Sequence, residues 1–167
     1  MTTYRIAGPA DVPTIRALIE SGYRGDSARQ GWTHEADLLE GDRTSEAEIA
    51  AAVAAPDKRV LLAEREGGLV GTVTATDLGG GTAYMGMLCV DPLRQAAGLG
   101  RDLIARIEAL AASDFGAHTM ELTVVDARGD LIAWYERRGY VRTGEIRPFP
   151  LPMDVPYLMV VLARAIG

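Results

Sequence analysis

The segment from residue 82 to residue 125 constrains the fold most strongly, because it places a strand, a turn, a helix and a second strand in succession. TAYMGMLCV (82–90) is typical of a strand, and residues 99–112 have the apolar spacing of an amphipathic helix. HTMELTVV (118–125) predicts the next strand. Parallel strands need a long crossover, usually helical, so this segment predicts a βαβ-like unit with parallel pairing near the centre of a sheet.

Shorter patterns extend this sheet in both directions along the chain. Each is a run of alternating or apolar residues bounded by glycine, proline or a charged turn, which is typical of strands. The expected strands are TYRIA (3–7), VLLAER (60–65), LVGTVTATDL (69–78), YVRTGEI (140–146) and YLMVVLARA (157–165).

Three further helices are expected. Asp11 is placed to cap a helix over 12–22, and Ser45 with Glu48 fits a capping box that opens a second helix. LIAWYERR (131–138) predicts a third, which ends at a glycine. The helix over 99–112 is expected to carry an apolar face and to have charged residues on its other faces. The apolar residues are Leu99, Leu103, Ile107, Leu110 and Ala111, and the charged ones are Arg101, Asp102, Arg106 and Glu108.

These elements predict one α/β (α+β) domain over residues 1–167, with a mixed central sheet of about seven strands and helices on both faces. The 167 residues, 48% of them hydrophobic, are enough for one sizeable core and too few to expect two. An exposed final strand would favour a homodimer.

Composition narrows the partners. The net charge of -6 and the pI near 4.9 argue against a nucleic-acid surface. No apolar run reaches the roughly 20 residues that span a bilayer, and the first residues do not resemble a signal peptide, so we expect a cytoplasmic protein with no membrane partner. Cys89 is the only cysteine, which excludes an internal disulfide and a cysteine-built zinc site, and no metal is expected.

The turn before the central helix has the features of an anion site. Helix N-termini carry unpaired N–H groups and the positive end of the helix dipole, and small residues in Gln95–Gly100 would let a phosphate approach them. A P-loop would need Lys-Ser/Thr after its last glycine, but Gly100 is followed by Arg101 and Asp102. A dinucleotide fingerprint would need a third glycine where Leu103 stands.

The remaining pattern, QAAGLG (95–100), matches Q/R-x-x-G-x-G/A and resembles the acyl-CoA pyrophosphate loop of the GCN5-related N-acetyltransferases (GNAT family). MLCVDP before it fits the same family, and WYERRGY (134–140) is similar to the family's LYEKLGF. The resemblance implies a GNAT-like acyl-CoA N-acyltransferase fold with acetyl-CoA as cosubstrate. Ala96 departs from the family, which usually has glycine there.

The resemblance also implies where the cosubstrate binds. The strand end 87–90 would splay from the strand at 119–125, and the pantetheine arm would lie in that gap. Main-chain groups of three consecutive residues would contact the acyl and pantetheine amides, and the turn would hold the phosphates. Arg128 would reach a phosphate or point to solvent. The implied cofactor-binding residues are Leu88, Cys89, Val90, Gln95, Ala96, Ala97, Gly98, Leu99, Gly100, Arg101 and Arg128.

Tyr135 is the implied general acid, since the family motif puts its hydroxyl beside the thioester sulfur. The alternative is that Tyr135 packs in the core together with Leu131 and Ile132, because the three share one helix face. A lone cysteine in an apolar strand is more often a buried hydrophobe than a nucleophile, so Cys89 indicates direct transfer without an acyl-enzyme.

The base and the acceptor pocket are less defined. An alkylammonium of pKa about 10.4 must lose a proton before it attacks, yet TAYMGMLCV carries no acid. Glu35, Glu121 or a water chain are candidates for the base, with His34 and Asp37 behind them. In GWTHEADL, Trp32 and Glu35 could bind a cationic amine, or serve helix packing.

Three functions follow as hypotheses. The first is an acetyl-CoA-dependent N-acetyltransferase that acts on a primary amine of a small molecule or amino acid derivative. The second is a catalytically weak acyl-CoA-binding regulatory module. The third is a protein N-terminal or lysine acetyltransferase. The proline-rich segment 148–156 would favour small substrates if it covers the acceptor site.

Overall fold

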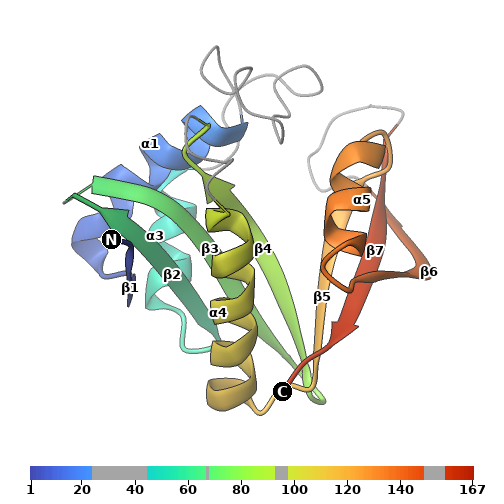
Figure 1. The fold of residues 1–167 in the computed structure, drawn as a ribbon. Helices are drawn as coiled ribbons and strands as arrows, with labels where there is room; N and C mark the ends of the chain where they lie inside the picture. Colours follow the sequence, from blue (N-terminus) through green and yellow to red (C-terminus); the bar gives the residue numbers. More distant parts are fainter. Residues whose placement is uncertain (24–44, 67, 93–97, 149–156) are drawn as a thin grey trace. The chain divides into compact units, whose positions relative to one another are not determined.

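The computed structural model describes residues 1–23, 45–66, 68–92, 98–148 and 157–167. In these residues seven strands hydrogen-bond in the order β1-β2-β3-β4-β5-β7-β6. The sheet is mixed, because β4 and β5 run parallel whereas β1 and β2, β2 and β3, β5 and β7, and β6 and β7 run antiparallel. In chain order the elements in Figure 1 are β1 (Thr3–Ile6), the 3-10 helix η1 (Pro9–Asp11), α1 (Val12–Tyr23), α3 (Glu46–Ala54), β2 (Lys58–Arg65), β3 (Gly68–Gly79), β4 (Thr82–Val90), α4 (Leu99–Phe115), β5 (Thr119–Val125), α5 (Gly129–Glu136), β6 (Val141–Pro148) and β7 (Leu158–Ala165).

The described chain divides into two compact units. The first unit comprises Met1–Thr76 and Met87–Ile107, and the second comprises Asp77–Gly86 and Glu108–Gly167. The first therefore holds β1, β2, most of β3, the end of β4, α1, α3 and the start of α4. The second holds the end of β3, the first part of β4, the rest of α4, α5 and the strands β5, β6 and β7. Within the described residues the predicted order of strands and α-helices is confirmed, and the short 3-10 helix η1 was not predicted.

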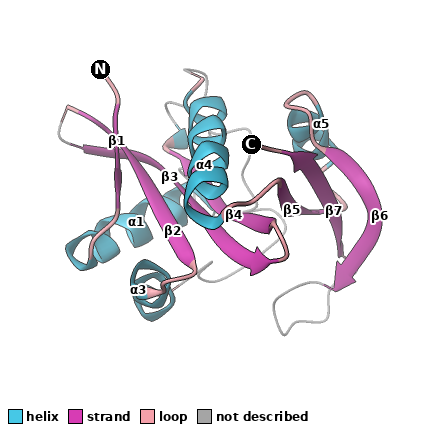
Figure 2. Ribbon diagram, turned by 90° about the horizontal axis from the view of Figure 1, so that it is seen from below, coloured by secondary structure: helices cyan, strands magenta, loops and turns pink. Residues whose placement is uncertain are grey.

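Helices cover both faces of the sheet in the first unit (Figures 1 and 2). On one face α4 packs so closely on β3 that a Cβ at Gly71 would lie 2.8 Å from Cδ1 of Leu103. On the other face α1 and α3 form a core with β2 and β4, whose members include Ile15, Ile19 and Ile49. Alternate residues of a strand point to opposite faces, so β3 serves both layers.

We predict that Gly71→Ala destabilises the protein by about 1–3 kcal/mol, the usual cost of inserting a methyl group into a packed interior. Leu103 is fully buried, and the carbonyl oxygen of Cys89 would lie only 3.4 Å from the new methyl group. The measurement is the urea midpoint of unfolding. Gly68→Ala on the same strand is the matched control, because the nearest atom to its Cβ would be 3.6 Å away. Equal midpoints for the two variants would show that α4 does not pack tightly on β3.

The sequence predicts a capping residue before α1 and another before α3, and the structure places these two residues differently. The Ser45 cap is confirmed, since its hydroxyl accepts a hydrogen bond from the Glu48 N–H at 3.2 Å. Asp11 lies in η1, before α1, and its carboxylate accepts from the Gly8 N–H and from the guanidinium of Arg5. These hydrogen bonds, that of Arg5 first, lower the pKa of Asp11 to about 2. Asp11 thus stabilises the turn before the helix.

In the second unit the last strand is not at the edge of the sheet. β7 lies between β5 and β6 and pairs with both, from Thr119↔Ala165 to Val125↔Met159 on one side and from Val141↔Ala163 to Pro148↔Leu158 on the other. The expectation of an exposed final strand was therefore wrong, and β6 forms that edge. The order of strands in the sequence does not reveal this, because β6 precedes β7 in the chain but lies outside it in the sheet. A homodimer through the final strand loses its support.

The helix α4 buries most of the apolar face that its spacing predicts, namely Leu99, Leu103, Ile107 and Ala111. Glu108 stands outside that apolar face in the sequence pattern, yet it is buried. Its side chain is buried because Tyr140 and Arg164 supply hydrogen bonds to both carboxylate oxygens. Those partners lie 32 and 56 residues away in sequence, beyond the reach of a helical pattern.

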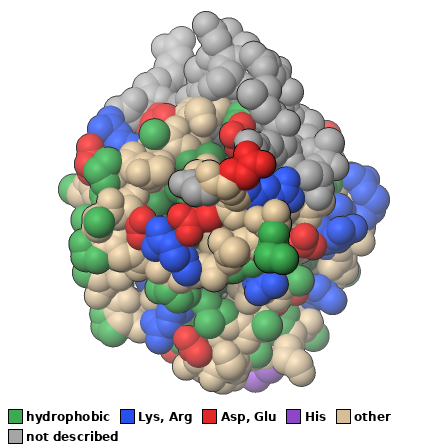
Figure 3. Space-filling model, turned by 60° about the vertical axis from the view of Figure 1, so that its left-hand side comes forward, with side chains coloured by type: hydrophobic (Ala, Val, Ile, Leu, Met, Phe, Trp, Pro, Cys, Tyr) green, Lys and Arg blue, Asp and Glu red, His purple; other side chains and the backbone are tan. Residues whose placement is uncertain are grey.

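Surface charges are mixed on the face shown in Figure 3, where acidic and basic side chains of the described residues are interspersed. In the first unit, Arg5 forms ion pairs with Asp11 at 2.7 Å and with Glu64 at 2.8 Å. Within the described ranges, no helix is both long enough and apolar enough to cross a bilayer.

Candidate active site

The end of β4, in the first unit, departs from regular strand geometry at Met87. Its φ of 54° lies in the left-handed region, which costs a non-glycine residue roughly 1–2 kcal/mol. Such strain persists only where the surrounding structure enforces it, and it concentrates at functional sites. Leu88, Cys89 and Val90 follow directly, and the Asp91 N–H then donates to the Val70 carbonyl at 2.9 Å. The irregularity thus falls where the sequence predicts contacts to the thioester.

Cys89 is part of the core and faces α1. Its side chain is buried at 4% exposure, and Sγ donates a hydrogen bond to the Leu18 carbonyl at 3.3 Å. A thiol needs exposure and an activating base or cation to act as a nucleophile. The burial of Cys89 agrees with its interpretation as a small hydrophobe.

The helix α4 begins directly after a glycine with left-handed geometry. Gly98 has φ 75°, and the Asp102 N–H donates to its carbonyl at 3.2 Å. A Cβ at this position would lie 3.0 Å from Nη2 of Arg101, whose exposed side chain can move, so the backbone conformation is what favours glycine here. The Arg101 side chain is exposed beside this turn. These features fit a phosphate group at the helix N-terminus. The other predicted residues of this turn, Gln95, Ala96 and Ala97, lie outside the described residues.

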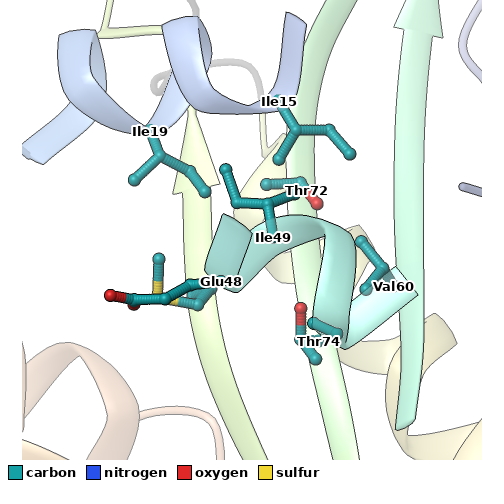
Figure 4. Close-up of a pocket in the computed structure, with 9 residues that line it drawn as sticks. Ile15, Ile19, Glu48, Ile49, Val60, Thr72 and Thr74 are labelled. Atoms are coloured by element: carbon teal, nitrogen blue, oxygen red, sulfur yellow. The ribbon is translucent and has the colours of Figure 1, made fainter. Parts of the chain in front are cut away.

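An apolar pocket lies between the two N-terminal helices and the sheet of the first unit (Figure 4). Its volume is about 120 Å³, and Ile15, Ile19 and Ile49 point toward one another across it. Glu48 is the charged residue among the described residues that line it, and its carboxylate lies at the margin of the group. Among the described residues, the lining is Ile15, Ile19, Glu48, Ile49, Ala52, Val60, Thr72, Thr74 and Met87. The sequence did not predict this pocket, because its walls come from five separate elements.

Tyr135 lies in the second unit, in the last turn of α5, with 8% of its surface exposed. Its ring makes edge-to-face contacts with Trp134, at 5.0 Å between centroids, and with Tyr140, at 6.0 Å. Its main-chain carbonyl accepts from the Tyr140 N–H at 3.2 Å. The side chain is therefore held in one orientation, as a positioned acid or a packed core residue would be.

Arg128 forms the N-cap position of α5 by its backbone, and the Ile132 N–H donates to its carbonyl at 3.0 Å. Its residue surface is only 8% exposed, so the option that it points to solvent was wrong. The guanidinium instead donates to Asp130 at 3.1 Å and 3.2 Å, and this hydrogen bond lowers the pKa of Asp130. A phosphate contact from Arg128 stays a prediction.

β4 and β5 pair in parallel over three residues, from Thr82↔Thr119 to Tyr84↔Glu121. The Tyr84 hydroxyl and Thr123 Oγ1 form a hydrogen bond of 2.6 Å just beyond the last pair. The predicted gap between residues 87–90 and β5 involves both units and stays a prediction.

The candidate bases separate into two groups. Glu121 is described, and its carboxylate accepts from Arg147 Nη2 at 2.9 Å. Glu35, Trp32, His34 and Asp37 lie outside the described residues. Among the described residues, no group of three or more His, Cys, Asp or Glu side chains is arranged to hold a metal ion.

Two features of the site were missed from the sequence. The sequence gives no indication of the left-handed backbone at Met87, because methionine does not favour that conformation. The buried contacts of Glu108 with Tyr140 had a weak signal, since a tyrosine at a core position needs a partner for its hydroxyl.

The mixed seven-stranded sheet, with helices on both faces in the first unit, is the fold expected of an acyl-CoA-dependent N-acyltransferase. A sequence profile of the acetyltransferase (GNAT) family matches residues 23–140 of the 167. The chain belongs to this family and is an acetyl-CoA-dependent acyltransferase. Comparison with curated proteins gave no match.

Many solved structures have a similar fold. The ribosomal-protein-S18-alanine N-acetyltransferase from Escherichia coli is 20% identical, with a TM-score of 0.75 over 100% of this chain and 95% of that one. The yncA structure from Salmonella typhimurium, with its cofactor acetyl-CoA, is 19% identical, with a TM-score of 0.73 over 100% and 95%. A spermidine N-acetyltransferase SpeG chimera from Vibrio cholerae and hSSAT is 17% identical, with a TM-score of 0.72 over 98% and 95%. The names of these neighbours cover different acceptors, so the fold does not select one.

Proposed function

We propose that this chain transfers an acetyl group directly from acetyl-CoA to the primary amine of a small molecule or amino acid derivative, with residues 1–167 acting as one domain. The observation that carries the proposal is the pocket in Figure 4. It includes Met87, the residue directly before the proposed thioester contacts. Its volume of about 120 Å³ is well below the roughly 300–1,000 Å³ of pockets for drug-sized ligands. A short alkyl group suits such a space better than a peptide does.

The cosubstrate would be held by main-chain groups, a small-residue turn and two arginines. Main-chain atoms of Leu88, Cys89 and Val90 would contact the acyl and pantetheine amides. The turn Gln95–Gly100 would hold the pyrophosphate, with Arg101 and Arg128 as cationic contacts. The exposed Arg101 beside the left-handed Gly98 supports the first of these two cationic contacts. Acetyl-CoA supplies an acetyl group activated as a thioester.

Tyr135 would act as the general acid. Its phenol would donate a proton to the sulfur as the C–S bond breaks and the bond from the amine nitrogen to the acetyl carbon forms. A phenol of pKa about 10 can protonate the departing thiolate, whose thiol has a pKa of about 8.5, only if the proton moves while negative charge develops on the sulfur. The position of the hydroxyl therefore decides the rate. A main-chain N–H of Leu88–Val90 would donate to the carbonyl oxygen where negative charge develops.

The acceptor would place its alkyl part in the pocket and its ammonium group near Glu48. Charge-assisted hydrogen bonds from an ammonium to a carboxylate are among the stronger polar contacts in proteins. Glu35 is proposed as the base or a second acceptor contact, together with Trp32. The proton that leaves the amine would pass to this base, and Tyr135 would recover its own proton from solvent.

The proposal predicts turnover with short alkylamines. The experiment measures thiol release from acetyl-CoA with a panel of propylamine to octylamine, amino acid esters, and peptides with free N-terminal or lysine amines. We expect activity with the small amines and weak or no activity with peptides. Glu48→Gln should raise KM for the amine by about 10-fold and leave KM for acetyl-CoA unchanged.

Other outcomes would contradict the proposal in different ways. Turnover of peptides alone would assign the enzyme a protein acceptor. Thermal stabilisation by acetyl-CoA without thiol release from any amine would favour a binding module. An unchanged amine KM in the Glu48 variant would exclude the pocket as the acceptor site.

A further inference from the structure

The second unit contains a buried carboxylate that the proposed chemistry does not use. Glu108, in the C-terminal half of α4, is 8% exposed. Its Oε2 accepts a hydrogen bond of 2.6 Å from the Tyr140 hydroxyl, and its Oε1 accepts one of 3.0 Å from Nη1 of Arg164. Burying a carboxylate is unfavourable unless its oxygens are paired, and a purely apolar residue would pack here without that requirement. These partners therefore do more than fill space.

Tyr140 links this carboxylate to α5. It is 1% exposed, and burial, followed by the hydrogen bond to Glu108, raises the pKa of Tyr140 far above its usual range. The hydroxyl thus stays protonated and donates to Glu108 at every physiological pH. On its other side Tyr140 contacts Tyr135 twice, through its N–H to the Tyr135 carbonyl at 3.2 Å and through its ring at 6.0 Å and 75°.

The third member, Arg164 on β7, passes over the turn that ends α5. A Cβ at Gly139 would lie 3.0 Å from Nε of Arg164, and Gly139 has φ 94°. The guanidinium therefore occupies the space that a side chain at the end of α5 would take. The cluster fixes the last turn of α5 from α4 on one side and from β7 on the other.

We propose that Glu108, Tyr140 and Arg164 are positioning residues that hold Tyr135 in the orientation needed for proton transfer. The inference rests on the proposed role of Tyr135 as general acid. Reaction rates depend steeply on the placement of the reacting groups, and a shift of about 1 Å can cost on the order of 100-fold. A cluster that contacts both the main chain and the ring of Tyr135 is placed to control that distance.

The test uses the full chain with acetyl-CoA and the best amine of the panel. Tyr140→Phe keeps the ring and removes the hydroxyl. Glu108→Gln keeps the shape of the side chain and removes its negative charge. We expect kcat to fall by on the order of 10-fold in each, with unchanged KM for acetyl-CoA. Glu145→Gln is the matched control, because Glu145 also pairs with an arginine of this unit, Arg147, at 2.7 Å but on the exposed β6. It should keep the parent kcat.

A double variant separates positioning from simple stability. If Tyr140 acts through Tyr135, Tyr140→Phe should lower kcat much less when Tyr135 is already phenylalanine. Arg164→Lys, which keeps the charge, provides the same comparison if Tyr140→Phe does not fold. Equal fold-changes in both backgrounds would overturn the positioning role, as would a lower melting temperature with the parent kcat.

The kcat values of Tyr135→Phe and Tyr140→Phe distinguish failure of the positioning inference from failure of the proposed function. A parent kcat in Tyr135→Phe would remove the general acid, and the cluster would then have no acid to position. A reduced kcat in Tyr135→Phe together with the parent kcat in Tyr140→Phe would overturn the positioning inference alone.

Discussion

Replacing Tyr135 by phenylalanine should lower kcat by about 100-fold or more while leaving the affinity for acetyl-CoA unchanged. The phenol proton is the one that the departing thiolate needs, and a positioned general acid typically contributes 10²–10⁴-fold. The ring contacts with Trp134 and Tyr140 do not involve the hydroxyl, so the variant should keep the packing of α5. Steady-state kinetics together with thermal stabilisation by acetyl-CoA measure both quantities.

The control for this change is Tyr4→Phe, which removes a hydroxyl from β1. Tyr4 packs under the guanidinium of Arg106, with Cζ 3.8 Å from the ring centroid, through its face and not through its hydroxyl. Its loss should leave kcat unchanged. If Tyr135→Phe also kept the parent kcat, Tyr135 would serve core packing only.

Replacing Gly98 by valine should abolish thermal stabilisation by acetyl-CoA. The left-handed backbone alone costs an ordinary residue roughly 1–2 kcal/mol, which corresponds to about 10-fold or more in affinity if the bound turn requires it. The added side chain also meets the Arg101 guanidinium at 3.0 Å and blocks the approach of a phosphate to the helix N-terminus. Calorimetric titration with acetyl-CoA gives the affinity directly.

Gly79→Val is the matched control for this prediction. Gly79 has φ 81° and open space around its Cβ position, so the substitution introduces the same kind of backbone strain at the β3–β4 turn. It should lower stability and leave acetyl-CoA affinity unchanged. Unchanged affinity in Gly98→Val would exclude this turn as the pyrophosphate site.

Most helices and strands could be predicted because each depends on interactions within its own short segment. Alternation between glycine turns defined β3 and β4, and the Ser45 cap marked the start of α3 as observed. The helix α5 begins two residues earlier than expected, at Gly129, because the Arg128 carbonyl accepts its first hydrogen bond. Ends of helices depend on such single contacts and are the least predictable part.

Features set by distant contacts were not predictable. Glu108 looks like a surface residue of an amphipathic helix, and only its pairing with Tyr140 and Arg164 explains its burial. The inner position of β7 depends on pairing with both β5 and β6, which a sequence pattern does not encode. The pocket beside Met87 combines walls from α1, α3 and three strands, so no single segment indicates it.

The site was partly predictable for a related reason. The Gly98 turn and Tyr135 belong to short motifs that one segment can carry. By contrast, the sequence left two orientations open for Arg128, and only its burial and its pairing with Asp130 removed the one that points to solvent.

Direct transfer of the acetyl group to an amine nitrogen is the central claim, and a single-turnover experiment tests it most directly. The protein is mixed in excess over isotope-labelled acetyl-CoA with a short alkylamine, and intact-protein and small-molecule mass spectra are recorded over the first turnover. We predict label on the amine as an N-acetyl group and none on the protein at any time, since Cys89 is buried against α1. Transient label on Cys89, or label that never leaves acetyl-CoA, would contradict the account.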